Sequence, residues 1–246
     1  NRTMHQNNLL FDLYGTLANI HTNESKKELW KLLAVWYKSH GALYSPWELQ
    51  KTYHQLIKEE KKQAALRHPD YTFLDIQLER VFEKLYINKN ISASPVLISE
   101  TALFFRTVSR THLNLYPGVR SMLQELHTHN KHCFLLTNAQ AIFTIPELKL
   151  LRIIDCFDGI IISSTEECAK PDPHFFQTAC IRYNNEKNDT LMIGNDPVTD
   201  IEGANAYGID SIYIHSNLSP KWTSTPKSTR HIQNGSIGQL KKLLLS

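Results

Sequence analysis

Four short polar clusters contain the side-chain types that transfer of a charged group requires. They are Asp12, the pair Thr137 and Asn138, the single Lys170, and the group Asn195, Asp196 and Asp200. A carboxylate can attack as a nucleophile, a hydroxyl and an ammonium group can bind phosphoryl oxygens, and further carboxylates can hold a metal ion. Ligation by oxygen atoms suits Mg²⁺. These residue types predict a phosphoryl site that uses magnesium.

Predicted strands place these clusters at one edge of a sheet. Short apolar runs over 8–11, 133–136, 157–162, 190–193 and 212–214 have the length and composition of buried strands. Segments with helical periodicity separate them, so we expect an α/β fold with a Rossmann-like parallel sheet and helices on both faces. In such a sheet, ligands bind beyond the carboxyl ends of the strands. The four clusters are expected to meet there.

A long helical segment interrupts this alternation. Ser25 with Glu28 and Ser45 with Glu48 match the capping box that starts a helix, and apolar residues recur at helical spacing after each. The chain is therefore interpreted as two domains: an α/β core of residues 1–21 and 111–246, and an all-helical cap domain of residues 22–110.

Composition excludes several classes of function. The net charge of +3 and the absence of a dense Lys/Arg block argue against nucleic-acid binding. The sequence shows no secretory signal and no apolar run of membrane-spanning length, so we expect a cytoplasmic protein without membrane contact. The four cysteines form no CxxC pair and are expected to be reduced. Either a monomer or a homodimer is compatible with the sequence.

Four motifs in order carry a family resemblance over essentially the whole chain. They are Phe-Asp-Leu-Tyr-Gly-Thr-Leu over 11–17, Leu-Leu-Thr-Asn over 135–138, Lys-Pro-Asp over 170–172, and Gly-Asn-Asp-Pro-Val-Thr-Asp over 194–200. Together they resemble the haloacid dehalogenase-like (HAD) hydrolase superfamily. The helical segment lies between the first and second motifs, which is similar to the subclass whose cap is inserted there.

The resemblance implies a mechanism and a set of ligands. Asp12 would attack a small phosphorylated metabolite and form an aspartyl phosphate, which water then hydrolyses. Thr137 and Lys170 would hold phosphoryl oxygens, with backbone donors near Leu13 and Asn138. Mg²⁺ would be held by Asp12, by the backbone carbonyl of Tyr14 and by the fourth motif, where Asp196 is favoured over Asn195 and Asp200.

Two departures from the family pattern keep other functions open. Phosphatases of the superfamily usually have an Asp acid–base at the position of Tyr14, and a phenol with a pKa near 10 is a poor base at neutral pH. Asn195 stands where many relatives have an acid. A weakly active or non-catalytic phosphate-binding protein is therefore one alternative. A 2-haloacid dehalogenase is another, because those enzymes also have Tyr there; they use no metal, but need a cap arginine early in the insertion, which this chain lacks. Arg67, His68, Arg106 and Arg110 are minor candidates for contact with a leaving group.

Overall fold

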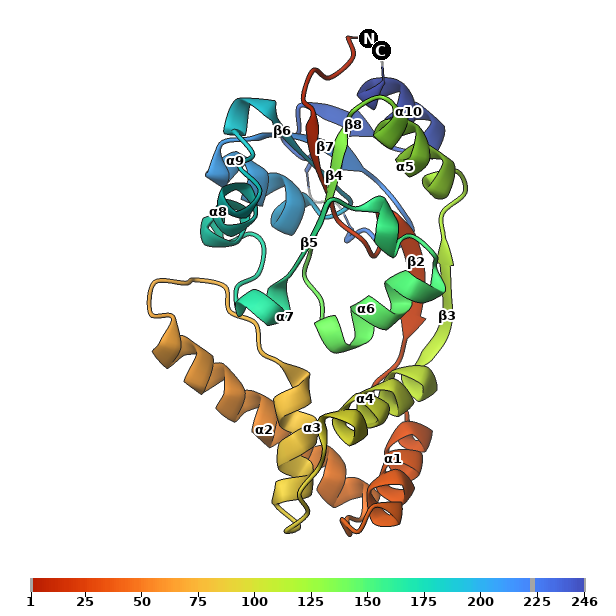
Figure 1. The fold of residues 1–246 in the computed structure, drawn as a ribbon, viewed down its shortest axis with the longest axis vertical. Helices are drawn as coiled ribbons and strands as arrows, with labels where there is room; N and C mark the ends of the chain where they lie inside the picture. Colours follow the sequence, from red (N-terminus) through yellow and green to blue (C-terminus); the bar gives the residue numbers. More distant parts are fainter. Residues whose placement is uncertain (1, 222–223, 246) are drawn as a thin grey trace.

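A six-stranded, all-parallel sheet forms the centre of the upper part of the molecule (Figure 1). The computed structural model describes residues 2–221 and 224–245. In spatial order the strands are β5 (Gly159–Ile162), β4 (His132–Thr137), β1 (Asn8–Phe11), β6 (Thr190–Gly194), β7 (Asp210–Ile214) and β8 (Arg230–Ile232). The parallel α/β sheet predicted from the alternation of strands and helices is confirmed.

The central strand β1 explains why the polar clusters converge. Phe11 pairs with Leu135 of β4 on one side and with Ile193 of β6 on the other. The residues that follow these three strand ends therefore emerge at the same edge of the sheet. Apolar side chains cover both faces of the central strands, which is why their sequences are continuous apolar runs.

Helices cover the two faces of the sheet. The helices of this part are α5 (Val119–Thr128), α6 (Ala141–Leu150), α7 (Ser163–Glu166), α8 (Pro173–Arg182), α9 (Gly203–Tyr207) and α10 (Ile237–Leu244), with short η1 (Ile154–Cys156), η2 (Lys187–Asp189) and the π-helical η3 (Pro197–Glu202). One apolar cluster joins α5 and α10 to the sheet, and another joins α8 and α9 to the opposite face. The side-chain stripes of these helices supply both cores.

Four further helices form a helical insertion, which we define as α1 (Lys27–Ser39), α2 (Pro46–Arg67), α3 (Leu78–Ile87) and α4 (Pro95–Ser109). They lie at the lower end of the molecule in Figure 1, beyond the carboxyl edge of the sheet. Their aromatic and aliphatic side chains pack into a cluster of their own, which Phe143 of α6 also joins. The antiparallel strands β2 (Ala18–Thr22) and β3 (Arg110–Leu115) form the ribbon that connects the insertion to the sheet.

Local expectations were only partly right. Ser45 caps α2 by accepting from the Glu48 N–H at 3.1 Å, as predicted. The capping box at Ser25 is wrong, because Ser25 binds Asn23 instead and α1 begins without a side-chain cap. The sequence interpretation also missed β2, β3, β8, α6 and α10. Short strands and a helix with an internal proline give weak periodic signals.

Candidate active site

The loop after β1 holds Asp12 in a tight turn. The Leu13 carbonyl accepts hydrogen bonds from the N–H groups of Thr16, Leu17 and Ala18. Gly15 has a φ of 90°, and a Cβ there would come within 2.3 Å of the Asn195 amide. Only glycine combines this conformation with so close an approach. Asp12 is 8% exposed, so its carboxylate is largely shielded from solvent.

Lys170 lies directly beside Asp12. Its Nζ donates to Asp12 Oδ1 at 3.0 Å, to Asp200 Oδ1 at 2.7 Å and to the Leu136 carbonyl at 2.7 Å. Burial alone would lower the pKa of Lys170, but Asp12 and Asp200 outweigh it and raise that pKa. The lysine is therefore a fixed positive charge next to Asp12. Two bonds hold its loop, since Asn138 Nδ2 donates to the Lys170 carbonyl at 2.9 Å and Asn138 Oδ1 accepts from the Lys170 N–H at 2.8 Å.

Asp200 is fully buried behind Lys170. Its second oxygen accepts from the Asp196 N–H at 3.0 Å. Gly194 allows this packing, because a Cβ there would come within 2.1 Å of the Asp200 carboxylate. Burial raises the pKa of Asp200, and the nearby charge of Asp12 adds to this effect, whereas Lys170 opposes it. The structure thus places Asp200 as the partner of Lys170.

Thr137, at the end of β4, carries a hydroxyl group that lacks a partner. The side chain is 1% exposed, and within residues 2–221 and 224–245 its Oγ1 makes no hydrogen bond. A buried polar group without a partner costs about 1–3 kcal/mol. Thr137 ends the strand next to β1, the strand that leads into Asp12.

The fourth motif uses its two adjacent polar residues differently. With its amide nitrogen facing the nucleophile loop, Asn195 donates to Asp12 Oδ2 at 3.0 Å and to the Tyr14 carbonyl at 3.3 Å. With its oxygen facing that way, it accepts from the Thr16 hydroxyl at 3.2 Å. The Asn195 amide therefore lies beside the Asp12 carboxylate and the Tyr14 carbonyl, and in the second orientation its oxygen joins theirs. Oxygen donors of this kind fit Mg²⁺.

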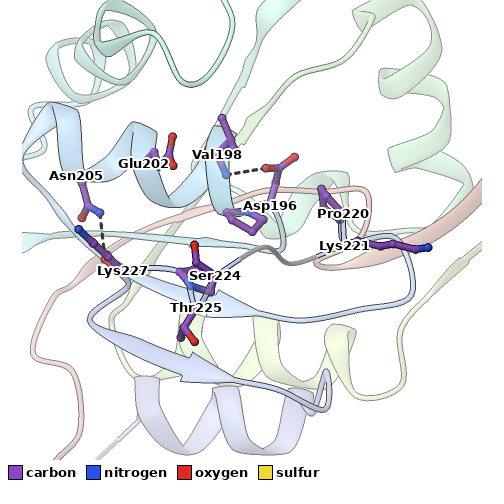
Figure 2. A pocket seen from close by; sticks show the side chains of 11 residues that line it. Asp196, Val198, Glu202, Asn205, Pro220, Lys221, Ser224, Thr225 and Lys227 are labelled. Carbon is purple, nitrogen blue, oxygen red and sulfur yellow. Dashed lines mark hydrogen bonds between the residues drawn. The ribbon is translucent and has the colours of Figure 1, made fainter.

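Asp196, the favoured metal ligand of the sequence prediction, caps the helix that follows it. Its Oδ1 caps η3 by accepting from the N–H groups of Val198 at 2.8 Å and Thr199 at 3.1 Å. Figure 2 shows the carboxylate beside Val198, at a pocket of about 350 Å³ whose lining includes Pro220 but not Asp12. In the described part of the chain, no group of three or more His, Cys, Asp or Glu residues could hold a metal ion. Asn195, not Asp196, contacts the nucleophile loop.

The Tyr14 side chain contacts α6. Its hydroxyl lies 2.9 Å from Thr144 Oγ1 and donates to Glu147. Burial and the charge of Glu147 raise the pKa of Tyr14 above its ordinary value. Thr144 and Glu147 were missed because α6 was not predicted. The spacing Thr-x-x-Glu over 144–147 matches a capping box, but α6 begins at Ala141 and contains Pro146 in its interior, so this pattern does not locate the helix.

A cavity of about 500 Å³ lies between the insertion and the carboxyl edge of the sheet. Its lining includes Tyr14, Glu24, Asp75, Arg106 and Asn138. A volume of this size suits a small metabolite. Of the minor candidates, Arg106 lines this cavity, while Arg110 binds Glu147, and Arg67 and His68 bind Glu167.

Known proteins share both the fold and parts of the sequence. The family model of the haloacid dehalogenase-like hydrolases matches residues 46–214, a range that begins after Asp12. A phosphoserine phosphatase of Thermus thermophilus is 25% identical over 174 residues, which cover 68% of this chain and 64% of the relative. This chain thus spans less than two thirds of the length of that relative.

No helix in the described ranges has both the length and the apolar character that crossing a membrane requires.

Solved structures with similar folds include two functional classes of one family. A 2-haloacid dehalogenase from Pseudomonas syringae has a TM-score of 0.65 at 17% identity, with 97% of this chain and 98% of that chain covered. A HAD phosphatase from Thermococcus onnurineus has a TM-score of 0.59 at 18% identity, with 96% of each chain covered. At these identities the likeness concerns the fold. Because the family model matches well over half of its residues, this chain belongs to the haloacid dehalogenase-like hydrolases.

Proposed function

We propose that the protein is a magnesium-dependent phosphatase that hydrolyses a small phosphorylated metabolite through an aspartyl phosphate on Asp12. The unpartnered, buried hydroxyl of Thr137 carries this proposal. It stands on the strand next to Asp12, and Lys170 approaches the same carboxylate with a fixed positive charge. A nucleophile, a hydroxyl donor and a cation at neighbouring strand ends match what a phosphoryl group needs.

The reaction divides into two displacements at phosphorus. An oxygen of Asp12 forms a bond to phosphorus while the bond to the leaving-group oxygen breaks, and the leaving group departs as an oxyanion that takes a proton from solvent. Water then forms a new bond to phosphorus, the bond to Asp12 breaks, and phosphate leaves. The water of the second step returns a proton to solvent. Lys170 and Thr137 bind the phosphoryl oxygens in both steps, with the N–H groups of Leu13 and Asn138 as further donors.

The metal site of this proposal is built from Asp12, the Tyr14 carbonyl and Asn195. Mg²⁺ held there would neutralise phosphoryl charge. Two of its three protein ligands are uncharged, so the site would bind the ion more weakly than one with two carboxylates. Asp200 is assigned to Lys170, and Asp196 to the start of η3. We therefore expect Asn195→Asp to lower the Mg²⁺ concentration needed for half-maximal activity, whereas Asp196→Asn leaves it nearly unchanged.

The position of Tyr14 limits the expected rate. Its hydroxyl is committed to Thr144 and Glu147, so it supplies no proton to the leaving group. General acid–base help is typically worth about 10²–10⁴ in rate. The enzyme should therefore hydrolyse p-nitrophenyl phosphate, whose leaving group needs no proton, far faster than alkyl phosphates. The lack of a proton donor at Tyr14 is also compatible with a phosphate-binding protein that has weak activity.

The helical insertion and the cavity shape the proposed substrate choice. We propose that residues 22–110 act as a cap over the core of residues 1–21 and 111–246, and that the cavity of about 500 Å³ receives the leaving group. The match to a phosphoserine phosphatase supports a small metabolite of this kind. Closure over the site would exclude water during formation of the intermediate.

The proposal is tested by measuring phosphate release from p-nitrophenyl phosphate and from a panel of small phosphoesters, with and without Mg²⁺. Activity that requires Mg²⁺ and is lost in Asp12→Asn is expected. A protein inert toward the whole panel at saturating Mg²⁺ would overturn it.

Dehalogenation is the second candidate, favoured by Tyr14 and by the presence of Arg106 at the cavity. Its product is distinct: chloride released from 2-chloropropionate in the presence of a metal chelator. We expect none, because Asp12 faces a magnesium-compatible set of oxygens.

A further inference from the structure

Glu147 lies at the junction of three elements, although it touches no reacting atom. One oxygen accepts from the Tyr14 hydroxyl, which belongs to the nucleophile loop. The side chain is 1% exposed and comes from α6 on the sheet side of the molecule. Glu147 is therefore hydrogen-bonded to the residue whose carbonyl lies 3.3 Å from the Asn195 amide.

The same carboxylate holds the end of the helical insertion. Arg106 Nε donates to Glu147 Oε2 at 3.0 Å, and Arg106 Nη2 donates to Oε1 at 2.9 Å. Arg110 Nη1 donates to Oε2 at 2.6 Å. Arg106 lies in the last turn of α4, and Arg110 begins β3, so both come from the segment by which the chain leaves the insertion.

Burial makes this cluster resistant to separation. The side chains of Arg106 and Arg110 are only 13% and 16% exposed. The Arg106 guanidinium also stacks over two rings, 4.9 Å from the centre of Phe143 and 5.8 Å from that of Tyr14. Withdrawal of the arginines would leave a buried carboxylate unpaired, which is strongly unfavourable. The insertion and the Tyr14 side chain therefore hold their positions together.

We propose that Glu147 is a positioning residue of the active site, which couples the position of the helical insertion to the conformation of the nucleophile loop through the Tyr14 hydroxyl. The catalytic part of this inference rests on the proposed function. Placement errors of about 1 Å in an active site can reduce the rate about 100-fold. A shift of Tyr14 would displace the carbonyl of the metal site and, two residues away, the attacking carboxylate.

The test compares Glu147→Gln with Tyr14→Phe, the double variant and the control Glu167→Gln. Glutamine keeps the shape of Glu147 but removes its charge, and phenylalanine removes only the hydroxyl. The control weakens another contact of the insertion, in which Glu167 binds Arg67 and Arg80 but not Tyr14. Circular dichroism first establishes that each variant is folded.

Steady-state kinetics with p-nitrophenyl phosphate give the first readout. Glu147→Gln should lower kcat at least about tenfold with a smaller change in KM, because misplacement affects the transition state more than binding. Tyr14→Phe should have a similar effect, and the double variant should fall no further than the worse single variant. Equal kcat losses in Glu147→Gln and Glu167→Gln, or losses that multiply in the double variant, would overturn the coupling.

Hydrogen exchange supplies a readout that needs no turnover. Peptides that contain the turn at Leu13–Leu17 should exchange faster in Glu147→Gln than in the wild type. In Glu167→Gln, their exchange rate should equal that of the wild type. Unchanged exchange in Glu147→Gln would refute the role of Glu147 even in an inactive protein. If the wild type hydrolyses no phosphoester, the proposed function fails, while this comparison still decides whether Glu147 positions the loop.

Discussion

The helical insertion contacts the sheet part of the molecule at two carboxylates that differ in their surroundings. Glu147 binds Arg106 and Arg110, whose side chains are 13% and 16% exposed. Glu167 binds Arg67 and Arg80, each 40% exposed, together with His68. Both use arginines from the insertion and an acid from the sheet part. The arginines at Glu147 are much less exposed than those at Glu167.

The contact around Glu167, which we call the outer contact, also includes backbone hydrogen bonds. The Thr72 and Phe73 N–H groups donate to Asp172 at 2.7 and 3.1 Å, and the Ala169 N–H donates to the Phe73 carbonyl at 3.0 Å. These bonds remain when Glu167 is removed, and water can solvate its exposed arginines. Similar ion pairs therefore have unequal consequences: the buried one is hard to replace, whereas the exposed one is one attachment among several.

Removal of the buried carboxylate should have the largest effect on stability. Glu147→Ala leaves two buried guanidinium groups without their partner and the Tyr14 hydroxyl without its acceptor. We expect a loss of about 3–5 kcal/mol in the free energy of unfolding. Urea unfolding followed by circular dichroism measures it. A loss below about 1 kcal/mol would show that the arginines find other partners.

Removal of the outer carboxylate should have a much smaller effect. Glu167→Ala is expected to reduce the free energy of unfolding by only about 1 kcal/mol, because its partners are partly solvated. The same urea experiment compares the two variants directly. If Glu167→Ala proved as destabilising as Glu147→Ala, exposure of the arginines would not be what separates the contacts.

Acid should weaken the ion pairs of both Glu147 and Glu167. Burial alone would raise the pKa of Glu147 and of Glu167, but their arginine partners lower both below the ordinary value. A carboxylate with a lowered folded-state pKa stabilises the protein above about pH 4.3 and loses that contribution as the pH falls through the folded pKa. Unfolding measured at successive pH values from about 5 downward should show a shallower decline in Glu147→Gln and Glu167→Gln than in the wild type. Parallel curves would contradict the assignment.

Added salt should have the smallest effect on the stability differences between the wild type and the two alanine variants. Screening acts on exposed pairs more than on buried ones, with a Debye length of about 3 Å at 1 M ionic strength. The stability difference between the wild type and Glu167→Ala should therefore shrink in concentrated NaCl, while the difference for Glu147→Ala persists. Thermal unfolding at low and high salt measures both, and an equal response would argue against the contrast in burial.

Part of this arrangement could be predicted from the sequence, because strand ends are local features. Asp12 and Thr137 follow apolar runs, and parallel pairing brings their strands together. The pairing of β2 with β3 could not be read locally, since each strand is short and its partner is distant along the chain. At Ser25, a competing bond to Asn23 displaced the expected cap.

The roles of adjacent residues in the fourth motif depend on packing that the sequence does not display. Asn195 faces the nucleophile loop, whereas Asp196 caps η3, and the turn between them is shaped by the fit of Gly194 against Asp200. Residue type alone favours the carboxylate as a metal ligand. Likewise, the partnership of Glu147 with Arg106 required the position of α6 relative to α4, and no local pattern contains it.

Detection of the covalent intermediate on Asp12 tests the central claim most directly. The protein with Mg²⁺ is mixed with a phosphomonoester, quenched in acid during the first turnover, digested and examined by mass spectrometry. We expect a phosphoryl group on the peptide that contains Asp12, and its absence in Asp12→Asn, which should also release no phosphate. Phosphate release that continues in Asp12→Asn, or a phosphoryl group on a different residue, would contradict it.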